Sequence, residues 1–238
     1  MGIEERLLLF VLNAMTDDKK TKRGGFYIKD EKLYLSVSQL KNMLAKPALI
    51  YWAAGEVWAE LVKNPNLSLE EARGLPDSVR NKAAGRGRTI HSLFEAYKAS
   101  GFETEQIPVY DGCYQAMKKW IADFNPEFAE QEKTVYSEEH KIAGTLDAIV
   151  KIGDERLLID AKTNKDASIY KEHEIQLSAY AHMAREAGLK VDGVALLALG
   201  EDGNYNFKRM TENFDIVLAC KTLYLWQNAE MCKKVGYN

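Results

Sequence analysis

The sequence predicts an α/β fold in which a central mixed sheet is flanked by helices. Up to Phe124 the apolar residues recur at helical spacing, whereas after Pro126 they show the alternation and short apolar runs that are typical of strands. The later segments follow the order three strands, helix, two strands, helix. With 238 residues, 46% of them hydrophobic, the chain can bury one substantial core. We expect a single domain, 1–238, in which a mainly helical region, 1–77, packs on a core of residues 78–238.

The individual elements follow from periodicity and from turn residues. The predicted strands are 132–136, 142–152, 156–163, 191–199 and 205–210. Gly153 and Asp154 supply a tight turn between the second and third strands, and Gly203 lies in the turn before the last. The predicted helices after the first region are 78–100, 111–124, 168–187 and 211–235. A break between helical pieces is predicted at Pro76.

The N-terminal region has its own helical pattern. Residues 38–62 carry Leu, Ala and Trp at helical spacing, and Pro47 is expected to start a second helix there. Trp52 and Trp58 are expected to pack against apolar neighbours, with stacking on nucleic-acid bases as the alternative.

Composition argues against several classes of protein. A net charge of -3 and a pI near 5.9 do not suit a surface that coats nucleic acid by charge alone, so any contact with DNA must be local. The 3 cysteines show no CxxC pairing, which argues against a disulfide framework and fits a reducing, cytoplasmic setting. The apolar run of residues 7–12 is far shorter than the ~20 residues of a membrane span, so no membrane association is expected.

One predicted strand ends in a charged pair. Alternation along 156–163 places Leu158, Asp160 and Lys162 on one face and the apolar residues between them on the other. A carboxylate and an ammonium group are costly to place at the end of a buried strand without a reason. The alternative is that Asp160 and Lys162 form a simple ion pair at a strand end with no catalytic role, because a pattern of three residues often occurs by chance.

A second carboxylate is expected beside the first. Asp147 lies on the preceding strand after Gly144, and the hairpin can bring it next to Asp160. Two such carboxylates repel each other unless a divalent cation neutralises them, and hard oxygen ligands suit Mg²⁺ or Mn²⁺. The ion would polarise a phosphodiester and activate a water molecule, while Lys162 would hold or help deprotonate that water.

Two helices add further polar pairs. His91 and Glu95 are one turn apart on the helix before the strands, and Gln176 and Tyr180 are one turn apart on the helix after them. Each pair alone is typical of an ordinary helix surface or a satisfied core.

Taken in order, these motifs resemble those of the PD-(D/E)xK nuclease superfamily, in its RecB-like exonuclease branch, which includes phage-encoded and mitochondrial genome-maintenance exonucleases. The similar stretches are SVSQLKNMLAKPALIYWAA from Ser36, GRTIHSLFEAY around His91, GTLDAI around Asp147, LLIDAKT around Asp160 and QLSAYA from Gln176. The resemblance implies a restriction-endonuclease-like core with an added N-terminal helical region.

The resemblance also implies roles for individual residues in a two-metal mechanism. The implied metal ligands are His91, Asp147, Asp160 and the Ala161 carbonyl. The implied catalytic residues are Asp147, Asp160, Lys162, Gln176 and Tyr180, the last two organising the site or touching the DNA backbone. Supporting residues around the metals would be Glu95, Glu132 and Thr163. Separately from the resemblance, a small basic cluster before His91 that includes Arg86 and Arg88 is a candidate for local contact with DNA, with a solvated charged face as the alternative.

Three functions remain open at this point. The first is a metal-dependent DNA exonuclease, acting on single strands or duplex ends in replication, recombination or repair. The second is a structure- or site-specific endonuclease with the same chemistry, and the third is an inactive DNA-binding module. The chain lacks a GxxxxGK[ST] phosphate loop, so unwinding would need a helicase or another recombination or replication protein as a partner. No iron-sulfur cluster is expected, because its four cysteine ligands are not available.

Overall fold

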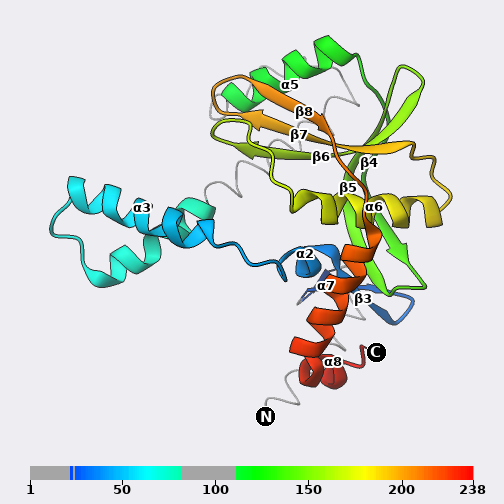
Figure 1. Cartoon of the computed structure of the whole chain (residues 1–238), viewed down its shortest axis with the longest axis horizontal. Coiled ribbons are helices and arrows are strands. Elements are labelled where there is room, and N and C mark those ends of the chain that lie inside the picture. The colour runs from blue at the N-terminus through cyan, green and yellow to red at the C-terminus, as the bar shows by residue number, and fades with distance from the viewer. Residues whose placement is uncertain (1–21, 24, 82–110, 238) are drawn as a thin grey trace.

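The computed structural model describes residues 22–23, 25–81 and 111–237. Their centre is an eight-stranded mixed sheet in the order β1-β2-β3-β5-β6-β7-β8, with β4 also paired to β5 (Figure 1). The strands are β1 Lys22–Arg23, β2 Phe26–Lys29, β3 Lys32–Ser36, β4 Glu127–Ser137, β5 Ile142–Ile152, β6 Glu155–Asn164, β7 Gly193–Gly200 and β8 Tyr205–Arg209. The helices are α2 Val37–Lys41, α3 Ala48–Lys63, α5 Asp111–Phe124, α6 His173–Glu186, α7 Phe214–Gln227 and α8 Ala229–Val235. The predicted class, a central mixed sheet flanked by helices, is confirmed.

The two edges of β5 are used differently. One edge pairs antiparallel with β4 from Ile142 to Lys151. The other edge is shared, because β3 pairs in parallel with Ile142 and Ala143 while β6 pairs antiparallel with Ala148 and the residues after it. Residues 144–147 lie between these two pairings, and no described strand pairs with them on this edge. The sheet therefore opens at the segment that carries Asp147.

Helices cover the two faces of the sheet. Beneath α6, Leu158 of β6 and Leu196 of β7 belong to a core cluster that includes Leu177 and Tyr180. On the opposite face, α5 contributes Met117 and Trp120 to a second cluster, together with Leu157, Ile159 and Ala161 of β6. The alternation predicted for β6 is confirmed, since its even-numbered and odd-numbered apolar residues enter different clusters.

A short helix, α2, is held against α6 by its buried residues. Val37 and Leu40 are fully buried, and the Ser36 hydroxyl oxygen accepts a hydrogen bond from the Ser38 backbone N–H at 3.3 Å. Because α2 has only five residues, its position depends on this burial and on β3, which leads directly into it. Lys41, the last residue of α2, is thereby brought to the side of α6.

The N-terminal region differs from the expectation in two ways. It contains the hairpin of β2 and β3, joined by Asp30 and Glu31 at φ values of 49° and 61°, whereas mainly helices are expected there. A helix also runs over 69–81 and continues through Pro76, so the predicted break is wrong. This stretch is largely exposed, so solvent can bond the backbone carbonyl that the missing proline N–H leaves free.

Most other predicted boundaries are close to the observed ones. Pro47 immediately precedes α3 as its N-cap, and α5 has the predicted bounds. The helix expected from residue 168 starts only at His173, and the expected terminal helix is divided at Asn228 into α7 and α8.

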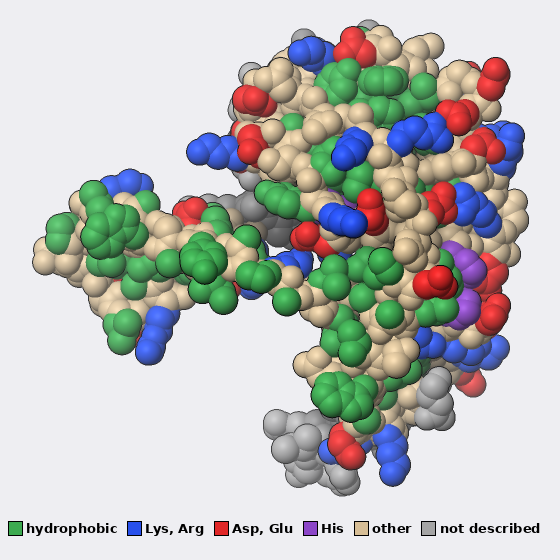
Figure 2. Space-filling view, viewed as in Figure 1, with side chains coloured by type: hydrophobic (Ala, Val, Ile, Leu, Met, Phe, Trp, Pro, Cys, Tyr) green, Lys and Arg blue, Asp and Glu red, His purple; other side chains and the backbone are tan. Residues whose placement is uncertain are grey.

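An arm formed by α3 and the helix 69–81 stands away from the sheet (Figure 1). None of the α3 residues is buried, and Figure 2 shows hydrophobic side chains over much of the arm. Trp58 is 71% exposed and Trp52 is 37% exposed, so neither side chain is buried in a core, and packing within the arm stays a prediction. None of the described helices combines the length and apolar character that crossing a membrane requires.

Candidate active site

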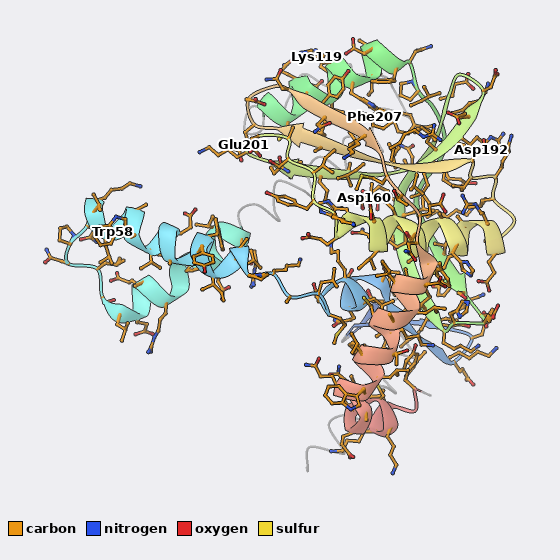
Figure 3. The ribbon with its side chains drawn as sticks, viewed as in Figure 1. Trp58, Lys119, Asp160, Asp192, Glu201 and Phe207 are labelled. Carbon is orange, nitrogen blue, oxygen red and sulfur yellow. The ribbon has the colours of Figure 1, made fainter. Side chains whose placement is uncertain are left out.

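A buried carboxylate at the end of β6 is the centre of the site. Asp160 is fully buried and lies between β6 and α6 (Figure 3). Its Oδ2 atom is 2.5 Å from Nζ of Lys162, whose side chain is 25% exposed. Alternation along the strand places both side chains on the α6 face. Burial of a charged carboxylate is costly unless charged or hydrogen-bonding groups surround it, and Lys162 is the first of these.

Asp147 is tied to the same strand end by the backbone. The regular pairing of β5 with β6 ends at Ala148 and Ile159. Past this point the Ala161 backbone N–H donates a hydrogen bond to Oδ2 of Asp147 at 2.7 Å. The carboxylate takes the place of a strand carbonyl where the two strands separate. The structure thus brings Asp147 and the Asp160 segment together, as the hairpin predicts.

The ammonium group of Lys162 lies against two oxygen atoms that are candidate metal ligands. Besides Asp160 Oδ2, it contacts the Ala161 carbonyl oxygen at 3.4 Å. Burial alone lowers the pKa of Lys162, but the nearby carboxylates of Asp160, Asp147 and Glu132 outweigh this effect and raise the pKa above its usual value. Lys162 is therefore a cation at neutral pH, placed where several carboxylates converge.

Gln176 and Tyr180 face Asp160 from α6. The Gln176 side-chain amide donates to Oδ1 of Asp160 at 2.8 Å and to the Tyr180 hydroxyl at 3.3 Å. Burial, with the charges of Asp160 and Asp147, raises the pKa of Tyr180 well above its usual value, so this phenol stays protonated. Because Gln176 and Tyr180 are one helical turn apart, both side chains reach the site from the same side of α6.

Gly144 makes room for the tyrosine. A Cβ atom at Gly144 would lie 2.3 Å from Cε1 of Tyr180, closer than non-bonded atoms can approach. The opening between β3 and β6 therefore accepts the phenol ring only because position 144 has no side chain. This glycine belongs to the same GTLD segment as Asp147.

The candidate supporting residues differ in their placement. Glu132 stands opposite Asp147 in register, since Gln131 pairs with Ala148 and Lys133 pairs with Leu146. It is close enough to contribute to the raised pKa of Lys162. Thr163 alternates to the α5 face of β6, and no described hydrogen bond joins its side chain to the site.

Two further groups that the sequence analysis does not assign to the site lie beside it. Lys41 of α2 donates to Oε1 of Gln176 at 3.1 Å. His173 is 8% exposed, and burial lowers its pKa to about 4 despite the opposing charge of Asp160. Its Nδ1 has no hydrogen-bond partner among the described residues. Neither could be inferred from spacing, because each depends on how α2 and the start of α6 approach β6.

The donor atoms suit a hard divalent cation. Asp160 Oδ2 is buried and makes no hydrogen bond among the described residues beyond its ion pair, and the Ala161 carbonyl oxygen lies close to the same ammonium group. Carboxylate and carbonyl oxygens are the ligands that Mg²⁺ and Mn²⁺ prefer. Within the described residues, no group of three or more His, Cys, Asp or Glu side chains is gathered as a metal site. Asp160 Oδ2 and the Ala161 carbonyl oxygen are nevertheless donors of the kind that such an ion prefers, and both lie against the Lys162 ammonium group.

The remaining predicted site residues lie outside the described part of the chain. These are His91, Glu95, Arg86 and Arg88. The roles expected of them stay predictions.

Comparisons with known proteins give a distant likeness in structure. No family model matches the chain, and no curated protein matches it. A putative exonuclease from Eubacterium rectale aligns with a TM-score of 0.47 and 12% identity over 86% of this chain and 82% of that one. An alkaline exonuclease from Laribacter hongkongensis aligns with a TM-score of 0.43 and 11% identity, covering 86% of this chain and 90% of that one. The same enzyme in complex with dAMP gives a TM-score of 0.45 and 14% identity over the same shares. At these values the likeness does not decide what this chain binds or cleaves.

Proposed function

We propose that the chain is a divalent-metal-dependent exonuclease that hydrolyses phosphodiester bonds in DNA. The observation that carries the proposal is the position of the Lys162 ammonium group, which contacts both Asp160 Oδ2 and the Ala161 carbonyl oxygen. The Lys162 ammonium group is thus a positive charge held against buried oxygen atoms. In metal-dependent phosphodiester hydrolysis, a cation bound by such oxygen atoms and a protonated group close to it both stabilise the charge that develops on the phosphate.

Asp147, Asp160 and the Ala161 carbonyl would hold Mg²⁺ or Mn²⁺, and His91 is proposed as an additional ligand. When bound, the ion supplies Lewis-acid polarisation of the phosphate and lowers the pKa of a water molecule. Asp160 is oriented for this role by Gln176, which donates to its Oδ1 atom at 2.8 Å. Glu132 is proposed to support a second ion, in keeping with its place opposite Asp147.

Lys162 would act as a hydrogen-bond donor. Its pKa is raised by the surrounding carboxylates, although burial opposes this, so Nζ keeps its proton at neutral pH. A protonated Nζ can orient a water molecule and counter charge that develops on the phosphate oxygens. Holding the water and helping to deprotonate it both stay roles proposed for this lysine.

The proposal has two finer parts, namely that the substrate is DNA and that hydrolysis starts at the ends of a strand. They are supported by the likeness of the motifs around His91, Asp147, Asp160 and Gln176 to those of RecB-like exonucleases. A role in replication, recombination or repair, with a helicase or recombination protein supplying the opened strand, belongs to the same proposal.

Cleavage of two DNA forms tests this function. The purified chain is incubated with Mn²⁺ or Mg²⁺ and with either end-labelled linear DNA or covalently closed circles, and Lys162→Ala serves as the matched variant. We expect nucleotides to be released from linear DNA only, with the rate falling at least 100-fold in Lys162→Ala.

Other outcomes have definite meanings. Cleavage of closed circles would replace the exonuclease with an endonuclease that uses the same site. Equal activity in Lys162→Ala, or none in a folded wild-type sample with either ion, would overturn the proposal.

A further inference from the structure

We propose that Lys41 is a positioning residue of the active site, which sets the orientation of the Gln176 amide and, through it, of the Asp160 carboxylate. The inference rests on the proposed function in one respect, namely that Asp160 binds a cation. Its structural basis is a chain of contacts that runs from α2 through α6 to β6. Lys41 Nζ lies 3.1 Å from Gln176 Oε1, and Gln176 Nε2 lies 2.8 Å from Asp160 Oδ1.

The setting of Lys41 is unusual for a lysine. No carboxylate lies within ion-pairing distance of it in the described part of the chain, and its hydrogen-bond partner there is the neutral Gln176. Burial lowers the pKa of Lys41 and the positive charge of Lys162 lowers it further, while the carboxylates of Asp160 and Glu172 oppose part of this effect. By contrast, Lys46 a few residues later is placed 3.7 Å from the carboxylate of Glu172. Partial burial of an ammonium group whose hydrogen-bond partner is neutral has a cost, and the place of Gln176 between Lys41 and Asp160 indicates that the contact has a use.

The use follows from the hydrogen-bonding capacity of each group. An ammonium group only donates and a carboxylate only accepts, whereas an amide has one end of each kind. With Lys41 on one side and Asp160 on the other, only one orientation of the Gln176 amide satisfies both neighbours. The flipped amide would direct its NH₂ group at the ammonium and its oxygen at the carboxylate. Lys41 therefore excludes the orientation that would repel Asp160.

The effect reaches both oxygen atoms of the carboxylate. Gln176 holds Oδ1, which leaves Oδ2 directed at the Lys162 ammonium group at 2.5 Å. The same amide NH₂ group also contacts the Tyr180 hydroxyl at 3.3 Å. Loss of Lys41 would remove one of the two charged groups that fix the amide, so the direction of Oδ2 would be held less firmly. Groups that orient a metal ligand in this way commonly affect metal affinity about 10-fold to 100-fold.

A direct contact between Lys41 and a DNA phosphate is the competing explanation, and a double-mutant cycle separates the two. The variants are Lys41→Met, Gln176→Leu and their combination, with Lys46→Met as the control. We expect Lys41→Met to weaken Mn²⁺ binding about 10-fold by calorimetry and to lower kcat while KM for DNA changes little. In the Gln176→Leu background the same change should have no further effect, because the relay is already broken. Lys41→Arg, which keeps a donor, should restore part of the loss.

A spectroscopic measurement makes the test independent of activity. The side-chain amide signals of Gln176, assigned by their disappearance in Gln176→Leu, should shift and exchange faster in Lys41→Met and stay unchanged in Lys46→Met. Unchanged amide signals in Lys41→Met would overturn the inference, as would equal effects of this variant on Mn²⁺ affinity in both backgrounds or an effect on KM alone. If the amide signals respond but the wild-type chain neither binds Mn²⁺ nor cleaves DNA, Lys41 keeps its orienting role and the proposed function fails.

Discussion

The two faces of β6 contrast sharply, although they belong to one strand of ten residues. On the α5 face, Leu157, Ile159 and Ala161 are all buried in an apolar cluster that continues to Trp120. On the α6 face, Leu158 is buried in the other cluster, but the next two positions are Asp160 and Lys162. The α5 face stabilises the strand along this length. On the α6 face only Leu158 packs in the core, and the next two side chains are charged.

The difference shows how a buried charge is supported. A rigid apolar face on one side keeps β6 in place while the other side carries the cost of burying Asp160. That cost is offset by the Lys162 ammonium group on the same strand and by the Gln176 amide of α6, with Lys41 of α2 behind the amide. Changes on the α5 face should therefore affect stability, and changes at the end of the α6 face should affect activity.

Asp160→Asn should give the largest effect, because it removes the charge at the centre of the polar face. We expect DNA hydrolysis to fall by about 10³-fold, the scale of losing a main electrostatic group of an active site. Asparagine has nearly the same shape and can still accept from Gln176, so circular dichroism should show an unchanged fold. Activity within a few-fold of the wild type would show that this carboxylate is only structural.

Trp120→Ala should have the opposite pattern, since this side chain is fully buried on the α5 face. It packs against Phe207, with ring centroids 5.5 Å apart, and truncation would leave a large cavity. We expect the free energy of unfolding to fall by about 3–5 kcal/mol in a urea titration. The rate of hydrolysis per folded molecule should stay near the wild-type value, and a selective loss of that rate would mean that the two faces are coupled.

Gly144→Ala tests the contact between the opening in the sheet and the site. The new methyl group would meet the Tyr180 ring at 2.3 Å, so the tyrosine must move. A loss of about 1–3 kcal/mol in stability is expected for such overpacking, together with lower activity. Gly55→Ala is a suitable control, because nothing lies within 4 Å of a Cβ atom there. Equal thermal midpoints for both variants would show that the ring adapts freely.

His173 provides the last of these effects, which depends on pH. Its pKa in the folded chain is lowered to about 4 by burial, from 6.5. Between these values the unfolded chain binds more protons, so stability falls as pH drops from about 6.5 to 4, by roughly 2–3 kcal/mol from this group. His173→Gln should reduce the slope of unfolding free energy against pH in this window. An unchanged slope would place the histidine in a more solvated setting.

Local sequence patterns predict much of the sheet and the centre of the site. The alternation in β6, the turn at Gly153 and the spacing of Gln176 and Tyr180 each depend on neighbours within a few residues. The hairpin of β5 and β6 then places Asp147 with the strand end. These features can be predicted because each follows from one period or one turn.

Other features depend on contacts between distant segments. The turn at Asp30 and Glu31 lacks the Asn-Gly or Asp-Gly pair that marks most tight hairpins, so β2 and β3 are not predicted. Lys41 enters the site only because α2 packs on α6. Gln176, its contact there, lies 135 residues later in the chain. His173, at the start of α6, is 8% exposed. Neither side chain has a periodic or spacing pattern that could have assigned it.

Calorimetric titration of Mn²⁺ into the wild-type chain and Asp160→Asn tests the central claim most directly. The claim is that buried oxygen atoms at the end of β6, now in contact with the Lys162 ammonium group, form a cation site. The account predicts saturable binding to the wild type and at least 10-fold weaker binding to Asp160→Asn, in a variant that unfolds cooperatively. Equal binding by the two proteins, or no binding by a folded wild-type sample, would contradict it.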